Sequence, residues 1–343
     1  MPRPGRPKFV VDLARAAAAA PSADNSQPWQ IKYCEPQLSI GYAERVAGKT
    51  FAADHHATLL AIGAATENIY TAANAMRVGL ERMAPAPSAY VGLRVDGSGA
   101  LPLVDTHPLF SRHTNRFAYK RAAPPSTLLD EVSALKEGEA EVRVVTDRHE
   151  ISTLARATDL SSRVRFQTRE VHELLAHSLR FDYDEVARGD GLDVDTFELP
   201  PGGRFLLAVT REWKTMARLN RLGVYRVFAA AESKPVASAP AVIAIKGGDP
   251  LDAGRLMQRC WMMLNAAGLA LQPHYVVADQ LLRRQLETMP AQHKQILEPV
   301  AQIAQRLFGS APLHIMLRCG YAARNAPRSR RLPLHKVFEV QPC

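Results

Sequence analysis

A polar loop near the N-terminus collects residue types suited to binding a polar ligand. Residues 21–29 read PSADNSQPW and lie between an alanine-rich stretch and an alternating one. Hydroxyl, carboxamide and free backbone N–H groups can satisfy many hydrogen-bonding atoms of one ligand. An ordinary helix-to-strand turn is the alternative interpretation. The candidate binding residues in this loop are Pro21, Ser22, Ala23, Asn25 and Gln27.

Two basic segments offer phosphate-binding chemistry. Residues 112–117 read RHTNRF, and residues 327–331 read PRSRR. Arginine pairs with phosphate through two parallel hydrogen bonds, and a threonine hydroxyl can add a third. Taken alone, spaced arginines equally indicate a solvated basic turn. The candidates are Arg112, His113, Thr114, Arg116, Arg328 and Arg330.

The elements that position these residues alternate between helices and short strands. Strands are expected at 29–33, 37–42, 90–95, 141–145, 241–245, 269–272 and 314–319, from alternating or apolar runs. Helices are expected at 10–20, 57–80, 126–135, 150–187, 250–267, 280–286 and 291–308. Asp249 and Pro250 read as a helix N-cap followed by proline at the first helical position. The pattern predicts an α+β protein with a mixed central sheet flanked by helices.

The two long helices end alike, which hints at an internal duplication. Residues 74–80 read NAMRVGL and residues 265–269 read NAAGL, each leading into an expected strand. A glycine followed by leucine at a helix end is common, so this echo is weak by itself.

Together these segments resemble the nitroreductase family, whose loop reads P-S-x-x-N-x-Q-P-W and reaches FMN from across a subunit interface. The resemblance implies that Arg112 and Thr114 hold the FMN phosphate, with His113 beside them. It implies that Arg116 approaches the flavin N1 and O2 region, where positive charge stabilises reduced flavin. Arg328 and Arg330 match the trailing basic pair that contacts the phosphate in the family.

A turn in the second half resembles the family segment that faces flavin N5. Residues 268–275 read GLALQPHY, similar to G-[LI]-x-[ST]-x-P-x-x, whose main-chain N–H groups point at N5. The resemblance places Pro273, His274 and Tyr275 in the cofactor site and implies a backbone donor from His274 or Tyr275.

The order of the motifs indicates two unequal halves sharing one flavin. In an ordinary family member the arginine-rich stretch precedes the loop, whereas here the loop comes first and each motif occurs once. The chain is similar to double-module nitroreductase-like proteins of the Acg type. We expect an intramolecular pseudo-dimer with residues 1–105 as the first half, residues 106–343 as the second, and a lid at 188–203.

The resemblance predicts an FMN-dependent oxidoreductase that takes electrons from NAD(P)H and reduces a small conjugated substrate such as a nitroaromatic or quinone. No catalytic side chain is assigned. A flavin-storage protein whose lid excludes NAD(P)H is the alternative, and specialised flavin oxidase chemistry is a third reading. The chain is expected as a monomer or homodimer, because fusion removes the need for a partner without forbidding one.

Composition and charge exclude several other classes. The formal charge is +9, but the basic residues form local patches that suit a compact anion. No nucleic-acid-binding motif and no apolar run long enough to cross a membrane is found, so neither partner is expected. The four scattered cysteines have no C-x-x-C spacing, which predicts unpaired thiols, no metal site and a cytoplasmic protein.

Overall fold

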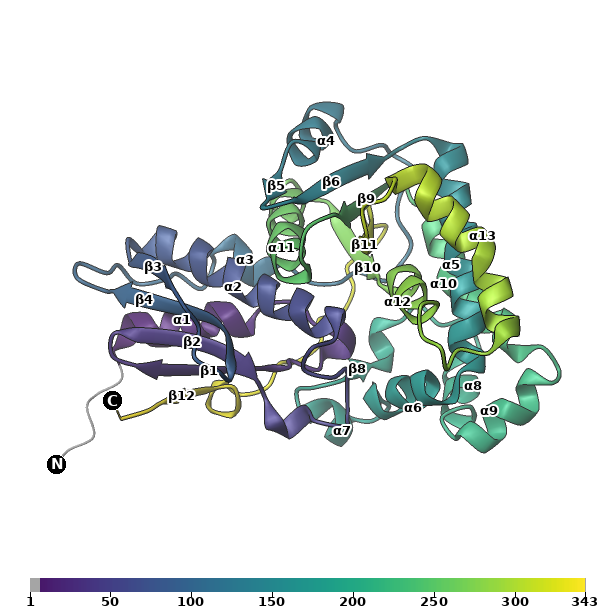
Figure 1. The fold of residues 1–343 in the computed structure, drawn as a ribbon, viewed down its shortest axis with the longest axis horizontal. Coiled ribbons are helices and arrows are strands. Elements are labelled where there is room, and N and C mark those ends of the chain that lie inside the picture. The colour runs from purple at the N-terminus through teal and green to yellow at the C-terminus, as the bar shows by residue number, and fades with distance from the viewer. Residues whose placement is uncertain (1–6, 343) are drawn as a thin grey trace.

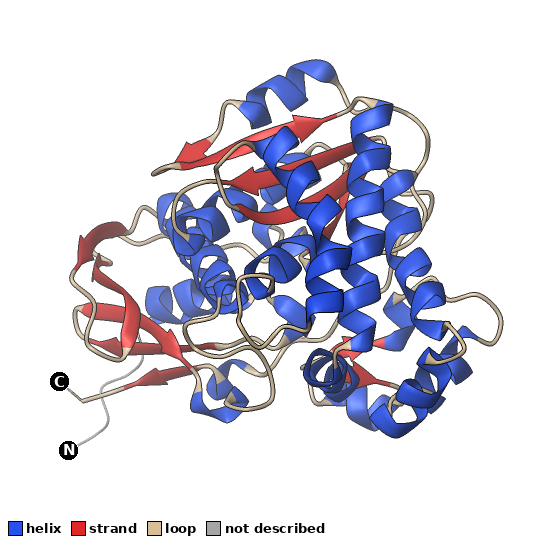
Figure 2. Cartoon of the chain, turned by 45° about the vertical axis from the view of Figure 1, so that its right-hand side comes forward, coloured by secondary structure: helices blue, strands red, loops and turns tan. Residues whose placement is uncertain are grey.

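The computed structural model describes residues 7–342 as two five-stranded sheets joined by packed helices (Figures 1 and 2). The strands are β1 (Trp29–Cys34), β2 (Gln37–Tyr42), β3 (Gly79–Met83), β4 (Ala89–Asp96), β5 (Lys136–Glu137), β6 (Ala140–Val145), β7 (Leu179–Arg180), β8 (Leu192–Asp193), β9 (Ala241–Lys246), β10 (Ala270–His274), β11 (Leu313–Gly320) and β12 (Phe338–Val340). The α-helices are α1 (Lys8–Ala18), α2 (His56–Met76), α3 (Pro108–Ser111), α4 (Ser126–Ser133), α5 (Arg148–Gln167), α6 (Arg169–Ser178), α7 (Tyr183–Ala187), α8 (Gly203–Val209), α9 (Trp213–Asn220), α10 (Val224–Ala237), α11 (Pro250–Ala266), α12 (Val276–Arg283) and α13 (Ala291–Phe308).

The same strand order occurs in both sheets. The first sheet runs β12-β1-β2-β4-β3 and the second runs β10-β11-β9-β6-β5. In chain order, α1-β1-β2-α2-β3-β4 is followed by α4-β5-β6-β9-α11-β10-β11, with further helices between β6 and β9 and between β10 and β11. The inner order β1-β2-β4-β3 therefore matches β6-β9-β11-β10, and α2 corresponds in position to α11.

The helices α2 and α11 cross at a pair of glycines. A Cβ atom added at Gly63 of α2 would collide with the carbonyl oxygen of Leu251, and one added at Gly254 of α11 would collide with that of Leu60. The contacts are reciprocal, and the pairs Leu60 with Leu251 and Gly63 with Gly254 keep the same spacing along the chain. Only glycine permits backbones to approach this closely.

Polar contacts fix the register of this crossing. The side chain of Gln258 donates to Asn68 Oδ1 at 2.7 Å, and Asn68 Nδ2 donates to the Ala16 carbonyl at 2.8 Å. Glu67, which is 6% exposed, accepts from Arg259 Nε at 2.7 Å. Buried polar groups stabilise a fold only when they are paired, so these bonds select one alignment of the two helices.

The C-terminal segment crosses back to the first half. Strand β12 pairs parallel with β1, opposite Ile31, Lys32 and Tyr33. The first sheet thus contains residues from both ends of the chain. If the chain is divided into residues 1–105 and 106–343, β12 belongs to the second part but lies in the sheet of the first. In Figure 1 the yellow C-terminal strand lies beside the purple strands of the N-terminal half.

The expected α+β class and a mixed five-stranded sheet flanked by helices are confirmed. The helical segments expected over 150–187 are α5, α6 and α7, separated at Thr168 and by β7. The segment at 188–203, expected as a lid, is not wholly at the surface, since Leu192, Val194 and Thr196 are buried. Cys34 is disulfide-bonded, so the prediction of unpaired thiols is wrong there, while Cys260 and Cys319 are free and buried.

The crossing of α2 and α11 generates a stability prediction. Gly63→Ala and Gly254→Ala should each lower the free energy of unfolding by about 1–3 kcal/mol, the usual cost of overpacking. Helix propensity alone predicts the opposite sign, a gain of about 0.5–1 kcal/mol. Urea unfolding measures the difference, with Ala75→Ser on the exposed face of α2 as the control. Stabilisation by either alanine variant would contradict the close crossing.

Candidate functional site

A cavity of about 1240 Å³ lies where the two halves meet the inserted helices. It brings together segments that are far apart in the sequence: the polar loop, α2, residues 109–118, α11, the turn after β10, and residues 328–331. Twelve of the fourteen residues named from the sequence line it, namely Pro21, Ser22, Ala23, Asn25, Arg112, His113, Thr114, Arg116, Pro273, His274, Tyr275 and Arg328. Gln27 and Arg330 do not.

The polar loop has a backbone conformation that its side chains disfavour. Asp24, Asn25 and Gln27 have φ angles of 49°, 55° and 50°, in the left-handed region. Such angles are uncommon for residues other than glycine and cluster at functional sites. The Ser22 hydroxyl closes the loop by accepting from the Gln27 N–H at 2.9 Å. The loop therefore presents side chains and amides to the cavity in an arrangement that the surrounding contacts must maintain.

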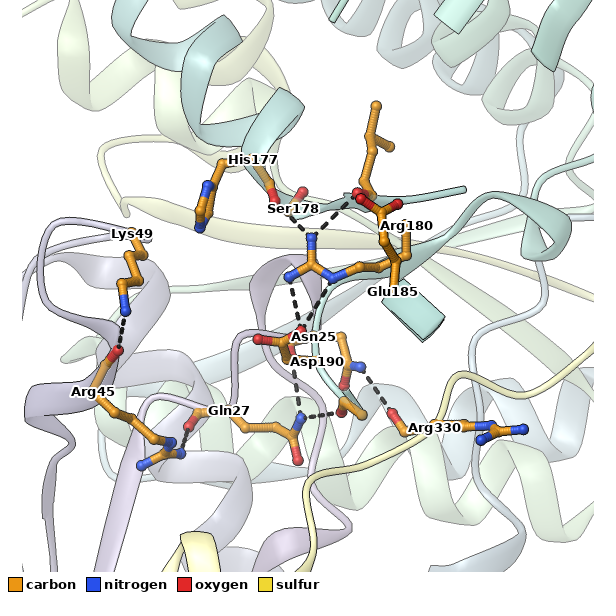
Figure 3. A network of polar contacts seen from close by, with 12 residues as sticks. Asn25, Gln27, Arg45, Lys49, His177, Ser178, Arg180, Glu185, Asp190 and Arg330 are labelled. Atoms are coloured by element: carbon orange, nitrogen blue, oxygen red, sulfur yellow. Dashed lines mark hydrogen bonds and ion pairs between the residues drawn. The ribbon is translucent and has the colours of Figure 1, made fainter. Parts of the chain in front are cut away.

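Those contacts come from the C-terminal segment and from the lid segment, residues 188–203. Asn25 Nδ2 donates to the carbonyl of Arg330 at 2.9 Å, as Figure 3 shows. Gln27 is fully buried; its Nε2 donates to the carbonyl of Gly189 at 2.9 Å and its Oε1 accepts from Leu332 N at 3.0 Å. Gln27 is thus committed to positioning the loop, which explains why it does not line the cavity.

Three arginines line one part of the cavity and are here called the cationic cluster: Arg112, Arg328 and Arg331. Burial, together with repulsion from Arg331 and Arg328, holds the pKa of Arg112 well below its usual value. Burial lowers the pKa of Arg331 to about 10. Within residues 7–342, none of the three forms an ion pair with a carboxylate. A buried cation without a counter-charge is costly, and Arg112 is buried, with the partly buried Arg331 and the exposed Arg328 beside it. This part of the cavity therefore suits an anion.

The arginines are oriented by carbonyl groups and an aromatic ring. Arg112 Nη2 donates to the Ala19 carbonyl at 2.8 Å, and its guanidinium lies 4.7 Å from the centre of the Trp261 ring. Arg331 Nη1 donates to Asn25 Oδ1 at 2.7 Å. Among the described residues, the buried Nε of Arg112 has no hydrogen-bond partner. A donor remains available to a ligand at this point.

Arg331, rather than Arg330, turns into the cavity. The side chain of Arg330 is exposed and lies over the ring of Tyr183 at 5.1 Å, while its backbone carbonyl accepts from Asn25. The segment is irregular, so side-chain direction does not follow a two-residue period. Of the final basic pair, the sequence analysis named Arg330, whereas the structure places Arg331 at the cavity.

A second polar group of residues also lines the cavity. Arg116 Nη1 donates to Thr196 Oγ1 at 3.1 Å, and burial lowers its pKa to about 10. Arg318, only 2% exposed, donates to Gln272 Oε1 at 2.6 Å. Burial, reinforced by Arg318 and Arg116, lowers the pKa of His274 to about 3, so this imidazole is neutral. These groups can form hydrogen bonds with a polar ring, and the histidine among them carries no positive charge.

Sequence reasoning missed the residues that complete this second polar group. Asp24 lines the cavity, and burial raises its pKa against the opposing effect of Arg165 and Arg116. Burial opposes ionisation of Arg165, but Glu232, which accepts from its Nη1 at 2.9 Å, contributes to a raised pKa. Asp24 sits inside the loop motif, whereas Arg165 and Glu232 lie on helices with no local signal of a site.

The motif around Arg112 is positioned as an extra strand-like segment. Thr114 forms a parallel bridge with Leu271 of β10, and Asn115 N donates to the Leu271 carbonyl at 3.0 Å. Further along, Lys120 N donates to the carbonyl of Tyr321 at 2.8 Å. The bonds to β10 and to Tyr321, which follows β11, therefore fix where Arg112 and Arg116 point.

The lid segment is latched over this motif. Glu198 accepts from Ala118 N at 2.6 Å and from Arg324 Nη2 at 2.9 Å. Phe197 lies under the Arg116 guanidinium at 5.0 Å and also lines the cavity. Residues 197–200 thus form part of the cavity wall.

Across the described part of the chain, no group of three or more histidine, cysteine or acidic side chains could hold a metal ion. Within that same part, no helix combines the length and apolar character needed to cross a membrane.

Comparisons with known proteins give distant similarities. No protein-family model matches the chain. It is 29% identical over 284 residues to uncharacterized protein MT1398 of Mycobacterium tuberculosis (strain CDC 1551 / Oshkosh), covering 79% of this chain and 39% of that protein. The chain therefore spans well under half the length of that relative.

Several solved flavoproteins are similar in part of their architecture. The FMN and NADPH-dependent nitroreductase NfnB of Sphigopyxis sp. strain HMH is 17% identical, with 70% of this chain and 100% of that chain covered and a TM-score of 0.37. A nitroreductase with bound FMN from Bacteroides fragilis is 11% identical, with coverages of 68% and 95% and a TM-score of 0.34. Scores this low assign no activity to this chain.

The neutral His274 predicts acid sensitivity of the ligand-free protein. The pKa of His274 is about 3 in the folded protein, whereas its ordinary value is 6.5. Between these two pH values the unfolded chain therefore binds one more proton than the folded protein. The stabilising effect is full above pH 6.5 and is lost as pH falls from 6.5 toward 3, at up to about 1.4 kcal/mol per pH unit. His274→Asn should flatten this loss in urea unfolding at pH 7, 6 and 5. Replacement of the exposed His149 by Asn should not, and equal slopes in both variants would refute the assignment.

Proposed function

We propose that the chain binds one FMN in this cavity and works as an oxidoreductase of the nitroreductase type. The observation that carries the proposal is the cationic cluster, in which Arg112 is buried and no member has a carboxylate partner among the described residues. It meets the polar loop in the same cavity. An anionic phosphate satisfies the arginines, and a polar ring and ribityl chain suit the loop and the second polar group. The motif resemblance supports FMN as the particular ligand.

The residues present fit this cofactor. Arg112, with its unpartnered Nε, together with Arg328 and Arg331, would hold the phosphate. Arg116 would lie near the pyrimidine part of the ring, where positive charge favours reduced flavin. The turn at Pro273, His274 and Tyr275, which lines the cavity before α12, would supply a backbone donor to the reactive edge.

When bound, FMN supplies two-electron hydride chemistry between NAD(P)H and a small conjugated substrate. The protein's part is to bind, orient and exclude water. The polar loop and the turn after β10 approach the cavity from different halves, so both halves orient the ring. The lid segment covers the motif through Thr196 and Glu198 and limits access of water. The substrate class and the use of NADH or NADPH as electron donor are part of this proposal.

We also propose that the chain is a fused pair of nitroreductase-like halves. The matching strand order, the reciprocal glycine crossing of α2 and α11, and the repeated helix ends support this. The first half offers the polar loop, and the second offers the phosphate-binding arginines and the turn after β10. One chain therefore needs no second copy to complete the site, and one FMN per chain follows.

A flavin-storage protein is the second candidate function. The latch formed by Glu198 with Ala118 N and Arg324 favours it, because a closed lid can exclude NAD(P)H while leaving the cofactor bound. Both candidates require FMN, so they separate only at the reduction step.

FMN binding should depend on the arginines that line the cavity. Arg112→Ala and Arg331→Ala should each weaken FMN binding by about 1.5–3 kcal/mol, the loss of a charge-assisted hydrogen bond. Arg330→Ala is the matched control, because its side chain is exposed and its backbone carbonyl remains. Quenching of flavin fluorescence measures the affinity. A protein that stays colourless with FMN, or equal losses at Arg330 and Arg331, would overturn the site.

Anaerobic mixing of the FMN-loaded protein with NADPH or NADH should bleach the flavin absorbance within seconds. Glu198→Ala removes both bonds of the latch and should leave bleaching as fast or faster, because the lid then opens more readily. Glu173→Ala, an exposed partner of Arg169 on α6, is the control. Absence of bleaching in the wild type, with bleaching restored in Glu198→Ala, would favour storage.

A further inference from the structure

Part of the cavity lining is apolar, and this part is here called the apolar chamber. Its walls include Phe166 of α5, Leu175 of α6, Leu199 of the lid segment, Leu207 of α8 and Phe228 of α10. All five lie in the stretch between β6 and β9, where the first half has no counterpart. The chamber is therefore an addition to the repeated architecture rather than part of it.

The chamber offers almost no polar contact to a ligand. Arg165 and Glu232 border it, but they pair with each other at 2.9 Å. Lys234 also borders it and is exposed to solvent. The remaining surface is chiefly leucine, valine and phenylalanine, so an occupant gains from apolar contact alone.

Helix α8 is more apolar than its surroundings explain. Its sequence is GRFLLAV, and none of its residues is buried. Leu206 and Leu207 line the chamber, while Val227 of α10 lines it and remains 58% exposed. Leu207 is only partly buried against the cluster around Leu192 and Val194. Exposed apolar surface is unfavourable in water, and an apolar ligand against Leu206, Leu207 and Val227 would remove part of that cost.

The size of the cavity leaves room for two ligands. Sites for a single drug-sized ligand enclose about 300–1,000 Å³, whereas this cavity encloses about 1240 Å³. The cationic cluster, the polar loop and the apolar chamber all line this one cavity.

We propose that the apolar chamber binds the aliphatic tail of an amphiphilic substrate, whose reducible head lies beside His274 and Arg116. The proposal rests on the proposed function for the head, but the tail site is a property of the inserted helices alone. The aliphatic lining and the absence of free hydrogen-bonding groups select a tail without polar substituents.

The test is equilibrium dialysis of the FMN-loaded protein with 4-alkylnitrobenzenes that carry methyl, butyl or octyl tails. Affinity should rise roughly threefold or more for each methylene that enters the chamber. Leu207→Trp and Ala231→Trp, which fill the chamber from two different helices, should abolish this dependence and leave binding of 4-nitrotoluene unchanged. Leu222→Trp is the matched control, since Leu222 is 82% exposed and does not line the cavity.

Affinity that does not depend on tail length would overturn the tail site, as would equal behaviour of the Leu207 and Leu222 variants. The two proposals are separated by measuring both quantities on the same protein: tail-dependent binding by dialysis, and reduction of the nitro group. Tail-dependent binding without reduction keeps the chamber and removes the enzymatic function, whereas reduction without tail dependence does the reverse.

Discussion

The close crossing of α2 and α11 is the constraint on which the rest of the molecule depends. Two glycines, Gly63 and Gly254, let each helix place its backbone against a carbonyl of the other. This contact sets the distance between the halves, so that the polar loop before β1 and the arginines after β4 and β11 reach one cavity. The continuous apolar core, which extends from the first sheet through both helices to the second, makes the arrangement rigid.

Charge distribution in the cavity follows from that geometry. The cationic cluster lies where three segments converge, and each arginine is held by backbone carbonyls or an amide rather than by a carboxylate. Neutral donors and acceptors orient a cation without cancelling it, so its full charge remains available to a ligand. Elsewhere in the cavity the carboxyl groups of Asp24 and Glu232 face the guanidinium groups of Arg116 and Arg165, so opposite charges are paired there.

The helices between β6 and β9 add to the cavity that the two five-stranded sheets and α2 and α11 form. The lid segment and the helices α5 to α10 add a small apolar cluster around Leu192 and Val194 and extend the cavity with aliphatic surface. Gln27 and Glu198 connect this insertion to the polar loop and to the arginine motif. The 188–203 segment is therefore bonded both to the polar loop and to the arginine motif.

Local patterns in the sequence determined the elements and the segments of the site. The hairpin at β1 and β2, the cap at Asp249 and the four motif segments are encoded by neighbouring residues, because caps, turns and strand alternation depend on local chemistry. Only the tertiary structure decided that Arg331 rather than Arg330 faces inward, that Gln27 clamps the loop, and that β12 returns to the first sheet. In irregular segments, side-chain direction is set by contacts with residues hundreds of positions away, and no local period records it.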